Sequence, residues 1–422
     1  MAQTRRARWP WIVWSAVVAA ILVAGAVFAA VRLGAPPPAA TVSIDAPAAL
    51  AVNTGVAPPV PVPRQGSFAV ATSLDGTVAA RADTAVRPIG SVAKAMTALV
   101  VVTAMPLTPG GSGPSRTMTA ADVLLYHQTV SAGGSNVPVR AGEVLTERDL
   151  LLALLLPSAN NIAETLAVWV SGTRAAFIAK LNATAAALGM GHTHFADPSG
   201  VSAQTVSTAA DLVLLARAVL ANPALAQLVA IRQATLPGGT VLTNLDIMLA
   251  RQPGWLGIKT GWTSAAGGCL LFAASHTYAP GLVMTVWGAA LGEPPLRAVD
   301  PTHPELGAAF AAAQGAVVAS FGRHVAVDLS TLQPEVTGDV TTAWGSATEV
   351  GLGTHARDVA VVSVGASMRL TVTRVAPPAP FGSGVTVARL TGVVDAHTSI
   401  TWQIVSRSAL PGPSPWWKLF HG

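Results

Sequence analysis

The alternation of apolar and polar residues divides the chain into six segments. A short basic segment, residues 1–8, precedes a charge-free apolar stretch over 9–32. Residues 33–65 are rich in Pro, Ala and Val, residues 66–322 mix helix and strand patterns, residues 323–408 show short strand patterns, and residues 409–422 form a Trp-containing tail. We therefore expect an export or membrane segment, a linker, two folded domains and a tail.

The apolar stretch has the length of a membrane span. Between Arg8 and Arg32 lie 23 uncharged residues, which at about 1.5 Å per residue cross a ~30 Å hydrocarbon layer. Arg5, Arg6 and Arg8 precede the span, and this excess of positive charge predicts a cytoplasmic N-terminus. Small residues over 26–30 also suit a cleavage site, so a removed signal peptide is the alternative. Under either interpretation the rest of the chain is exported.

The segments that flank the central domain show no catalytic pattern. The Pro-rich segment 33–65 predicts an extended, semi-rigid spacer. Residues 323–408 predict a separate β-rich domain of the sandwich type, with strands near 325–329, 359–364, 368–375, 385–394 and 400–406. In the tail, Trp416 and Trp417 either dock on this domain or contact the membrane interface.

The central domain, 66–322, predicts an α+β fold. Strand patterns over 68–73 and 77–81 surround a Leu-Asp-Gly turn, and further strands are expected at 255–262, 269–274 and 282–287. Helical patterns lie between them, at 91–104 and over 119–219, and a last helix is expected at 304–321. Thr146 with Asp149, and Thr208 with Asp211, resemble helix-capping pairs. We expect a helical cluster inserted into an antiparallel sheet whose strands come from both ends of the domain.

Composition excludes several kinds of site. The chain is 51% hydrophobic and 11% charged, so it is not a disordered polyelectrolyte. A single cysteine, Cys269, rules out an internal disulfide or a multi-cysteine metal centre, and we expect it to be a buried core residue. The nine histidines form no metal-binding motif, so no metal is expected. A net charge of +5 without a Lys-rich run suits an anionic surface better than nucleic acid.

Lysine is rare in this chain, and its positions are informative. Only 4 of the 25 basic residues are Lys, so a retained Lys marks a place where Arg would not serve. Ser91 and Lys94 are three residues apart at the start of a predicted helix and therefore share a face. A buried Lys with a depressed pKa could take the proton of this serine and make it nucleophilic. By itself the pair is also consistent with a capping serine and a surface lysine.

Two further groups of polar residues follow. Ser158-Ala159-Asn160 comes directly after Pro157, at a turn between helices, where a hydroxyl can relay a proton and an amide can hold a carbonyl. Capping of the next helix is the simpler role for these side chains. Lys259-Thr260-Gly261 lies on a predicted strand, where Lys259 and Thr260 could bind a carboxylate and Gly261 allows close approach. An edge-strand lysine is the simpler interpretation there.

The order SxxK, SxN and KTG is a known catalytic pattern of penicillin-binding proteins and class A β-lactamases. The chain resembles the D-alanyl-D-alanine carboxypeptidases, the low-molecular-weight penicillin-binding serine peptidases. The resemblance is carried by the sequences RPIGSVAKAMTALVV, LLLPSANNIAETLA, THFADPSGVS, STAADLVLLA and GIKTGWTSAAGG. It implies a β-lactamase/transpeptidase-like fold for residues 66–322, followed by the small β-rich domain.

The resemblance also implies roles for individual residues. Ser91 would attack the carbonyl between two D-alanines, Lys94 would be its base, and Ser158 would assist proton transfer. The remaining site residues would bind the substrate: Asn160, Lys259, Thr260, Gly261, the backbone N–H of Trp262 together with that of Ser91 as an oxyanion hole, and Arg297 as a possible helper. No cofactor is implied. The expected partners are a peptidoglycan stem peptide ending in D-Ala-D-Ala, β-lactams and a membrane, with an extracytoplasmic catalytic domain.

Three other functions compete with this interpretation. A β-lactamase of class A would carry a glutamate about 35 residues after the SxN group, but residues 191–200 hold no Glu and offer Asp197 instead. A non-catalytic wall-binding or sensor protein could retain the same fold. A transpeptidase would differ from a carboxypeptidase only in the acceptor that receives the acyl group.

Overall fold

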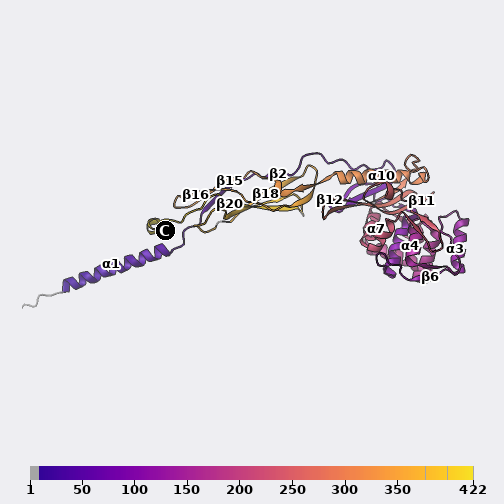
Figure 1. Cartoon of the computed structure of the whole chain (residues 1–422), viewed down its shortest axis with the longest axis horizontal. Helices are drawn as coiled ribbons and strands as arrows, with labels where there is room; N and C mark the ends of the chain where they lie inside the picture. Colours follow the sequence, from indigo (N-terminus) through magenta and orange to yellow (C-terminus); the bar gives the residue numbers. More distant parts are fainter. Residues whose placement is uncertain (1–8, 376, 397, 422) are drawn as a thin grey trace, which may run out of the picture. The chain divides into compact units, whose positions relative to one another are not determined.

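The computed structural model describes residues 9–375, 377–396 and 398–421, so the basic segment 1–8 lies outside it. The described chain forms two compact units. The central unit comprises residues 57–325, and the β-rich unit combines the N-terminal part up to Val56 with the chain from Ala326 onward. Figure 1 labels the elements of both.

A five-stranded antiparallel sheet forms the framework of the central unit. Its two hairpin strands from the start of the unit pair with three strands from its end, as the sequence predicts. The strands, in spatial order, are β11 (Trp255–Thr263), β12 (Gly267–Ala279), β13 (Leu282–Glu293), β3 (Ser67–Thr72) and β4 (Gly76–Arg81). Every residue of β3 is buried, because helices cover both faces of the sheet.

One face of the sheet packs against a single long helix, α10 (Pro304–Gly322). Phe310 and its helical neighbours meet an aromatic cluster on the sheet, where the Phe272 ring stacks on Trp255 with centroids 5.6 Å apart and on Phe68 with centroids 6.2 Å apart. This core is separate from the core on the other face.

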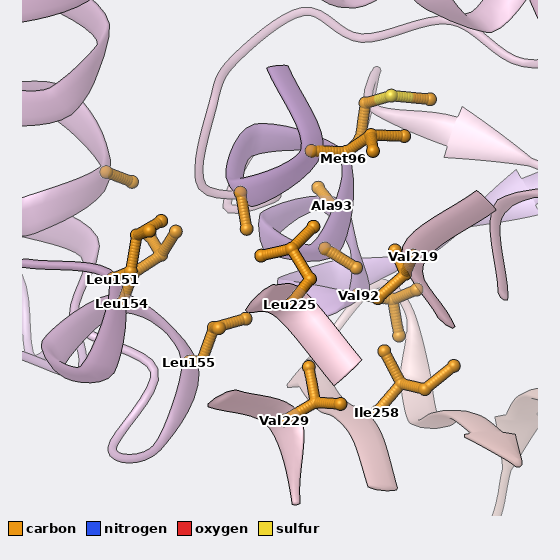
Figure 2. Close-up of a cluster of buried hydrophobic side chains, with 14 of the residues drawn as sticks. Val92, Ala93, Met96, Leu151, Leu154, Leu155, Val219, Leu225, Val229 and Ile258 are labelled. Atoms are coloured by element: carbon orange, nitrogen blue, oxygen red, sulfur yellow. The ribbon is translucent and has the colours of Figure 1, made fainter. Parts of the chain in front are cut away.

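The opposite face carries the helical cluster. The helices are α2 (Ala93–Ala104), α3 (Ala120–Ser131), α4 (Glu147–Leu155), α5 (Asn160–Ser171), α6 (Arg174–Ala187), α7 (Ala209–Ala221) and α8 (Pro223–Val229). Helix α2 is buried over nearly its whole length, and Figure 2 shows Met96 and Ala93 among side chains from α4, α8 and β11. Thr146 and Asp149 form the capping box expected at the start of α4, and Thr208 caps α7.

Smaller elements complete the central unit. They are the short strand pairs β5–β8 (Arg87–Pro88 with Val206–Ser207), β6–β7 (Ser115–Thr117 with Val144–Thr146) and β9–β10 (Gln233–Thr235 with Val241–Thr243), together with α9 (Met248–Arg251).

The strands of the β-rich unit are hydrogen-bonded in one continuous order. Its seven strands run in the order β1 (Thr41–Asp45), β15 (Thr337–Thr341), β16 (Ala347–Leu352), β20 (Ser399–Ser406), β19 (Thr386–Val393), β18 (Ser367–Arg374) and β2 (Ala49–Ala51). The two edge strands, β1 and β2, are joined by only three residues, which reach about 14 Å at most. The sheet must therefore curve until its edges lie close together. A separate pair, β14 (His324–Asp328) with β17 (Val359–Ser363), accompanies it.

The expected spacer over 33–65 is thus wrong in its first half. Residues 41–51 supply the two edge strands of the β-rich unit, so only the part after them is a connection. Strands as short as β2 carry too few residues to display an alternating pattern, and their partners lie far away in the sequence.

The N-terminal helix α1 (Trp9–Gly34) is long and apolar enough to cross a membrane, and no residue in its most apolar window is buried. The C-terminal helix α11 (Pro415–His421) lies against its end, where Lys418 donates to the Leu33 carbonyl at 3.0 Å. The Trp417 ring contacts Trp344 of the β-rich unit, with centroids 5.6 Å apart, while Trp416 is exposed. The tail therefore docks through one face and leaves the other open.

Candidate active site

Ser91 lies in a tight turn that leads into α2. A 3-10 turn, Gly90–Val92, precedes the helix and touches strand β11. Gly90 has a φ of +52°, and a Cβ there would stand 3.2 Å from the backbone nitrogen of Trp262. A Cβ at Gly261 would stand 2.9 Å from the backbone nitrogen of Ser91. Two glycines thus allow the strand and the helix start to approach closely, and they bring the backbone nitrogens of Ser91 and Trp262 to the same place.

Lys94 is in contact with the hydroxyl of Ser91. Its Nζ lies 2.8 Å from Oγ of Ser91 and donates to the carbonyl of Ser199 at 2.8 Å. The side chain is completely buried. Burial and then the positive charge of Lys259 hold the pKa of the Lys94 ammonium well below its usual value, against the opposing charges of Asp197 and Glu164. A neutral amine in contact with a serine hydroxyl can accept its proton.

The turn around Asp197, which the sequence pattern alone does not place in the site, holds Lys94. The Asp197 carboxylate accepts hydrogen bonds from the backbone of Ser199 and Val201 and from the hydroxyls of Ser199 and Thr205. Although burial opposes it, these hydrogen bonds hold the pKa of Asp197 below its usual value. The ordered turn presents the Ser199 carbonyl to Lys94. The Asp-Pro-Ser-Gly sequence was a usable signal for this turn, but the contact with Lys94 arises from folding.

Ser158 and Asn160 do not cap the helix that follows them. The N-cap of α5 is Ala159, and no side chain caps that end. Ser158 has a φ of +67°, a left-handed conformation that costs a non-glycine residue roughly 1–2 kcal/mol. Its buried Oγ and the Oδ1 of Asn160 have no hydrogen-bond partner among the described residues. A strained residue with an unpaired buried hydroxyl is typical of a functional position.

Lys259 is a second buried lysine, on β11. Its Nζ donates to the backbone carbonyl of Thr260 at 3.1 Å and lies 3.5 Å from the Thr260 hydroxyl. Burial lowers the pKa of Lys259 to about 7, although the charge of Asp246 opposes the shift. Asp246 is itself buried, and burial raises its pKa to about 6 even though Trp255 Nε1 donates to it at 2.9 Å. Lys259 is therefore neither a surface residue nor the edge-blocking lysine of the simpler interpretation.

Two further residues expected to bind the substrate are Trp262 and Arg297. The indole of Trp262 is half exposed. Arg297 lies on an exposed segment after β13, where it donates to the Pro301 carbonyl at 3.3 Å and its neighbour Leu296 bonds to the start of α10. No described contact joins Arg297 to the other site residues.

Cys269 is buried in the core, as expected, and burial raises its pKa to about 12. Among the described residues no cluster of His, Cys, Asp or Glu could hold a metal.

A cleft of about 560 Å³ opens beside Asn160. Helices α3, α5 and α6 and the Asp197 turn form its walls, and Glu164 and Arg174 stand in it. Its volume suits an extended chain segment more than a single small group.

Comparison with known proteins agrees with this geometry. A family described as D-alanyl-D-alanine carboxypeptidase matches residues 69–290, which is more than half of the chain. The D-alanyl-D-alanine carboxypeptidase DacB2 of Mycobacterium tuberculosis is 44% identical over 136 residues, which are 31% of this chain and 46% of that protein. A D-alanyl-D-alanine endopeptidase of Escherichia coli is 36% identical over 193 residues, 44% of this chain and 59% of that protein. The chain thus matches about half the length of these curated relatives.

Solved structures extend the likeness to more than half of the chain. A D-alanyl-D-alanine carboxypeptidase from Mycobacterium tuberculosis is 31% identical with a TM-score of 0.52, covering 63% of this chain and 96% of that one. The Streptomyces K15 DD-transpeptidase is 26% identical with a TM-score of 0.51, covering 64% of this chain and 98% of that one. By its sequence, its sheet and helical cluster and the arrangement of its serine and lysines, this chain belongs to the D-alanyl-D-alanine carboxypeptidase family.

Proposed function

We propose that this protein is a membrane-tethered serine D-alanyl-D-alanine carboxypeptidase that removes the terminal D-Ala from peptidoglycan stem peptides and is acylated by penicillins. One observation carries the proposal. A completely buried lysine, Lys94, stands 2.8 Å from the hydroxyl of Ser91, with its pKa held low by burial and by a second lysine. A buried amine in contact with a serine hydroxyl adds little to stability, but it can accept the proton of that hydroxyl.

The reaction begins with proton transfer. Neutral Lys94 takes the proton of Ser91 as Oγ attacks the carbonyl carbon between the two D-alanines. Negative charge develops on the carbonyl oxygen, where the backbone N–H groups of Ser91 and Trp262 would stabilise it. The proton passes through the Ser158 hydroxyl to the leaving amine, the C–N bond breaks, and D-Ala departs. Water then attacks the Ser91 ester, and reversal of the proton transfers regenerates the serine and releases the shortened peptide.

Two groups orient the substrate across Ser91. Lys259 and the Thr260 hydroxyl would bind the terminal carboxylate, and Gly261 would let the peptide backbone lie against β11. Asn160 would hold an amide carbonyl upstream of the scissile bond through its side chain. β-Lactams carry a carboxylate and an amide in a similar relation, so the same contacts account for penicillin acylation.

Rapid hydrolysis of β-lactams is disfavoured by the state of Asp197. A carboxylate that activates water for deacylation needs a free lone pair and a pKa near neutrality. Asp197 already accepts from four donors and its pKa is lowered. A long-lived penicillin adduct follows from this. The intact contact between Ser91 and Lys94 argues against a non-catalytic sensor, because a protein that only binds does not need a buried amine at a serine.

The membrane tether rests on α1. The stretch Trp11–Gly34 is long and apolar enough to cross a membrane, with Arg32 as its one charged residue. With Arg5, Arg6 and Arg8 before it, the N-terminus would face the cytoplasm and both folded units the outside. Membrane fractionation of the full chain, followed by N-terminal sequencing, distinguishes a retained anchor from a cleaved signal peptide.

The decisive experiment uses intact mass spectrometry and a product assay. After brief exposure to benzylpenicillin, wild type should carry one stable adduct, and Ser91→Ala should carry none. Wild type should also release D-Ala from an N-acyl-L-Lys-D-Ala-D-Ala peptide, and the same variant should not. Release of D-Ala together with the hydrolysed N-acyl-L-Lys-D-Ala product identifies a carboxypeptidase. Transfer of the acyl group to an added amine identifies a transpeptidase, and cleavage of a cross-linked dimer identifies an endopeptidase. A folded wild type that neither forms an adduct nor cleaves peptide contradicts the proposal.

A further inference from the structure

The cleft beyond Asn160 contains an acid–base pair that the mechanism does not use. The Nε of Arg174 donates to both carboxylate oxygens of Glu164, at 3.2 and 3.1 Å, and both side chains line the cleft. The Glu164 side chain is 23% exposed and that of Arg174 is 50% exposed. The pair therefore stands at the boundary between the site and solvent, where a ligand can reach it.

The position of Glu164 follows from the helix that carries Asn160. The two residues are four apart on α5, so they lie on one face, one turn from each other. The electrostatic influence of Glu164 reaches both Asp197 and Lys94. Glu164 lines the cleft together with Asn160, Asp197 and Ser199, and the Ser199 carbonyl accepts from Lys94.

The substrate direction of the proposed function would place the upstream residue in this cleft. In the proposed function the terminal carboxylate lies at Lys259 and the upstream amide at Asn160. A chain that passes Asn160 and continues in the same sense enters the cleft of about 560 Å³, which is large enough for a long side chain. The residue before D-Ala-D-Ala would therefore meet Glu164 and Arg174.

The pair is complementary to a group that carries both charges. Its hydrogen bonds use only Nε of Arg174, and among the described residues the Nη nitrogens have no hydrogen-bond partner. A guanidinium in this state can bind a carboxylate through its remaining donors, while the Glu164 oxygens can accept from an ammonium. A lone ammonium would compete with Arg174, and a lone carboxylate would face Glu164. A zwitterion satisfies both partners without adding net charge.

We infer that this cleft is an upstream peptide subsite in which Glu164 and Arg174 bind a side chain that ends in both an ammonium and a carboxylate. The inference rests on the proposed function for the direction of the peptide. It makes Glu164 and Arg174 specificity-determining residues, separate from the groups that act on the scissile bond.

The test measures binding separately from turnover. The full chain in detergent, carrying Ser91→Ala, is titrated calorimetrically with three N-acetyl-X-D-Ala-D-Ala peptides. X is 2,6-diaminopimelate, lysine or Nε-acetyllysine, which present a zwitterion, an ammonium and a neutral amide. We expect the diaminopimelate peptide to bind about tenfold more tightly than either of the others, a ratio equivalent to about 1.4 kcal/mol.

Variants of Glu164 and Arg174 identify which residue binds the ammonium of the ligand and which binds its carboxylate. Arg174→Gln should reduce the diaminopimelate peptide to the affinity of the lysine peptide. Glu164→Gln should leave the diaminopimelate peptide no better bound than the acetylated one. Arg140→Gln, which removes an exposed arginine outside the cleft, should keep the wild-type ratios. Ratios within one variant cancel any general loss of affinity.

Two outcomes overturn the inference. Equal affinities of the three peptides, or ratios that stay unchanged in both Glu164→Gln and Arg174→Gln, would reduce the pair to a salt bridge that joins α5 to α6. The proposed function is judged separately, by release of D-Ala from the same peptides by the wild-type chain. Selective binding without release would refute the activity and keep the subsite.

Discussion

Replacing Lys94 with arginine would remove the proposed base while keeping a positive side chain at the same place. Lys94 is completely buried, with Nζ 2.8 Å from Oγ of Ser91 and 2.8 Å from the Ser199 carbonyl. Burial and the charge of Lys259 hold its pKa well below the usual value, so that the neutral amine is accessible. An arginine stays protonated under all these conditions and can only donate.

The size of the effect follows from the role of the group. General-base catalysis contributes about 10²- to 10⁴-fold to a rate, so acylation of Lys94→Arg should fall by about 10³-fold, or about 4 kcal/mol of barrier. The larger guanidinium must also fit a site with no exposed surface, beside Lys259. This crowding adds to the loss and does not offset it.

The assay is the rate of adduct formation with benzylpenicillin, followed by intact mass at several antibiotic concentrations. Lys180→Arg is the matched control, because Lys180 is exposed on α6 and should tolerate the change. Circular dichroism on heating establishes that the Lys94→Arg protein is folded. If folded Lys94→Arg is acylated within about tenfold of the wild-type rate, Lys94 is not the base and the mechanism above is wrong.

Three further predictions concern stability and pH. Ser158→Gly should relieve the left-handed backbone at φ +67° and raise the free energy of unfolding in urea by about 1 kcal/mol, while acylation falls because the hydroxyl is lost. Ser158→Ala should lose activity without this gain in stability. Equal stability of the two variants would contradict the strain argument. Glu147 is buried, both its carboxylate oxygens are unpartnered among the described residues, and burial raises its pKa to about 7. In the unfolded chain this carboxyl ionises near pH 4, so the free energy of unfolding should fall as pH rises from 4 to 7. The free energy of unfolding of Glu147→Gln should exceed that of wild type by about 2 kcal/mol at pH 8 and match it at pH 4. A constant difference in urea denaturation across this range would refute the assignment. Burial lowers the pKa of Lys259 to about 7. Under the proposed mechanism the charged form of Lys259 would bind the substrate carboxylate, so kcat/KM for the peptide should decline above pH 7. Lys259→Arg should flatten that decline, and an unchanged alkaline limb would show that another group titrates there.

The candidate catalytic residues could be read from the sequence because their spacing is tied to local structure. Ser91 and Lys94 share a helical face by virtue of the three-residue spacing alone, and the structure brings them into contact. The capping box of Thr146 and Asp149 is equally local, and it forms as expected. The apolar stretch of α1 and the alternation of strands and helices in the central unit are also set by short-range pattern.

Contacts between distant segments could not be predicted in this way. Lys94 meets the carbonyl of Ser199, 105 residues away, and only the folded turn around Asp197 explains why that carbonyl is available. The resemblance implied Arg297 as a helper in the site, but no described contact joins Arg297 to the other site residues, and its segment bonds to the start of α10. The sequence predicts a spacer over 41–51, because the strands there are short and pair only with segments at the other end of the chain.

The electrostatics of the site belong to the tertiary structure as well. The sequence identifies Lys94 and Lys259 as unusual because the chain otherwise favours arginine. Their low pKa values arise from burial, which depends on how α2 packs between the sheet and the helical cluster. Residue types and local spacing therefore determined which groups could react. Packing decided their protonation, because the desolvation of a charge depends on every segment that surrounds it.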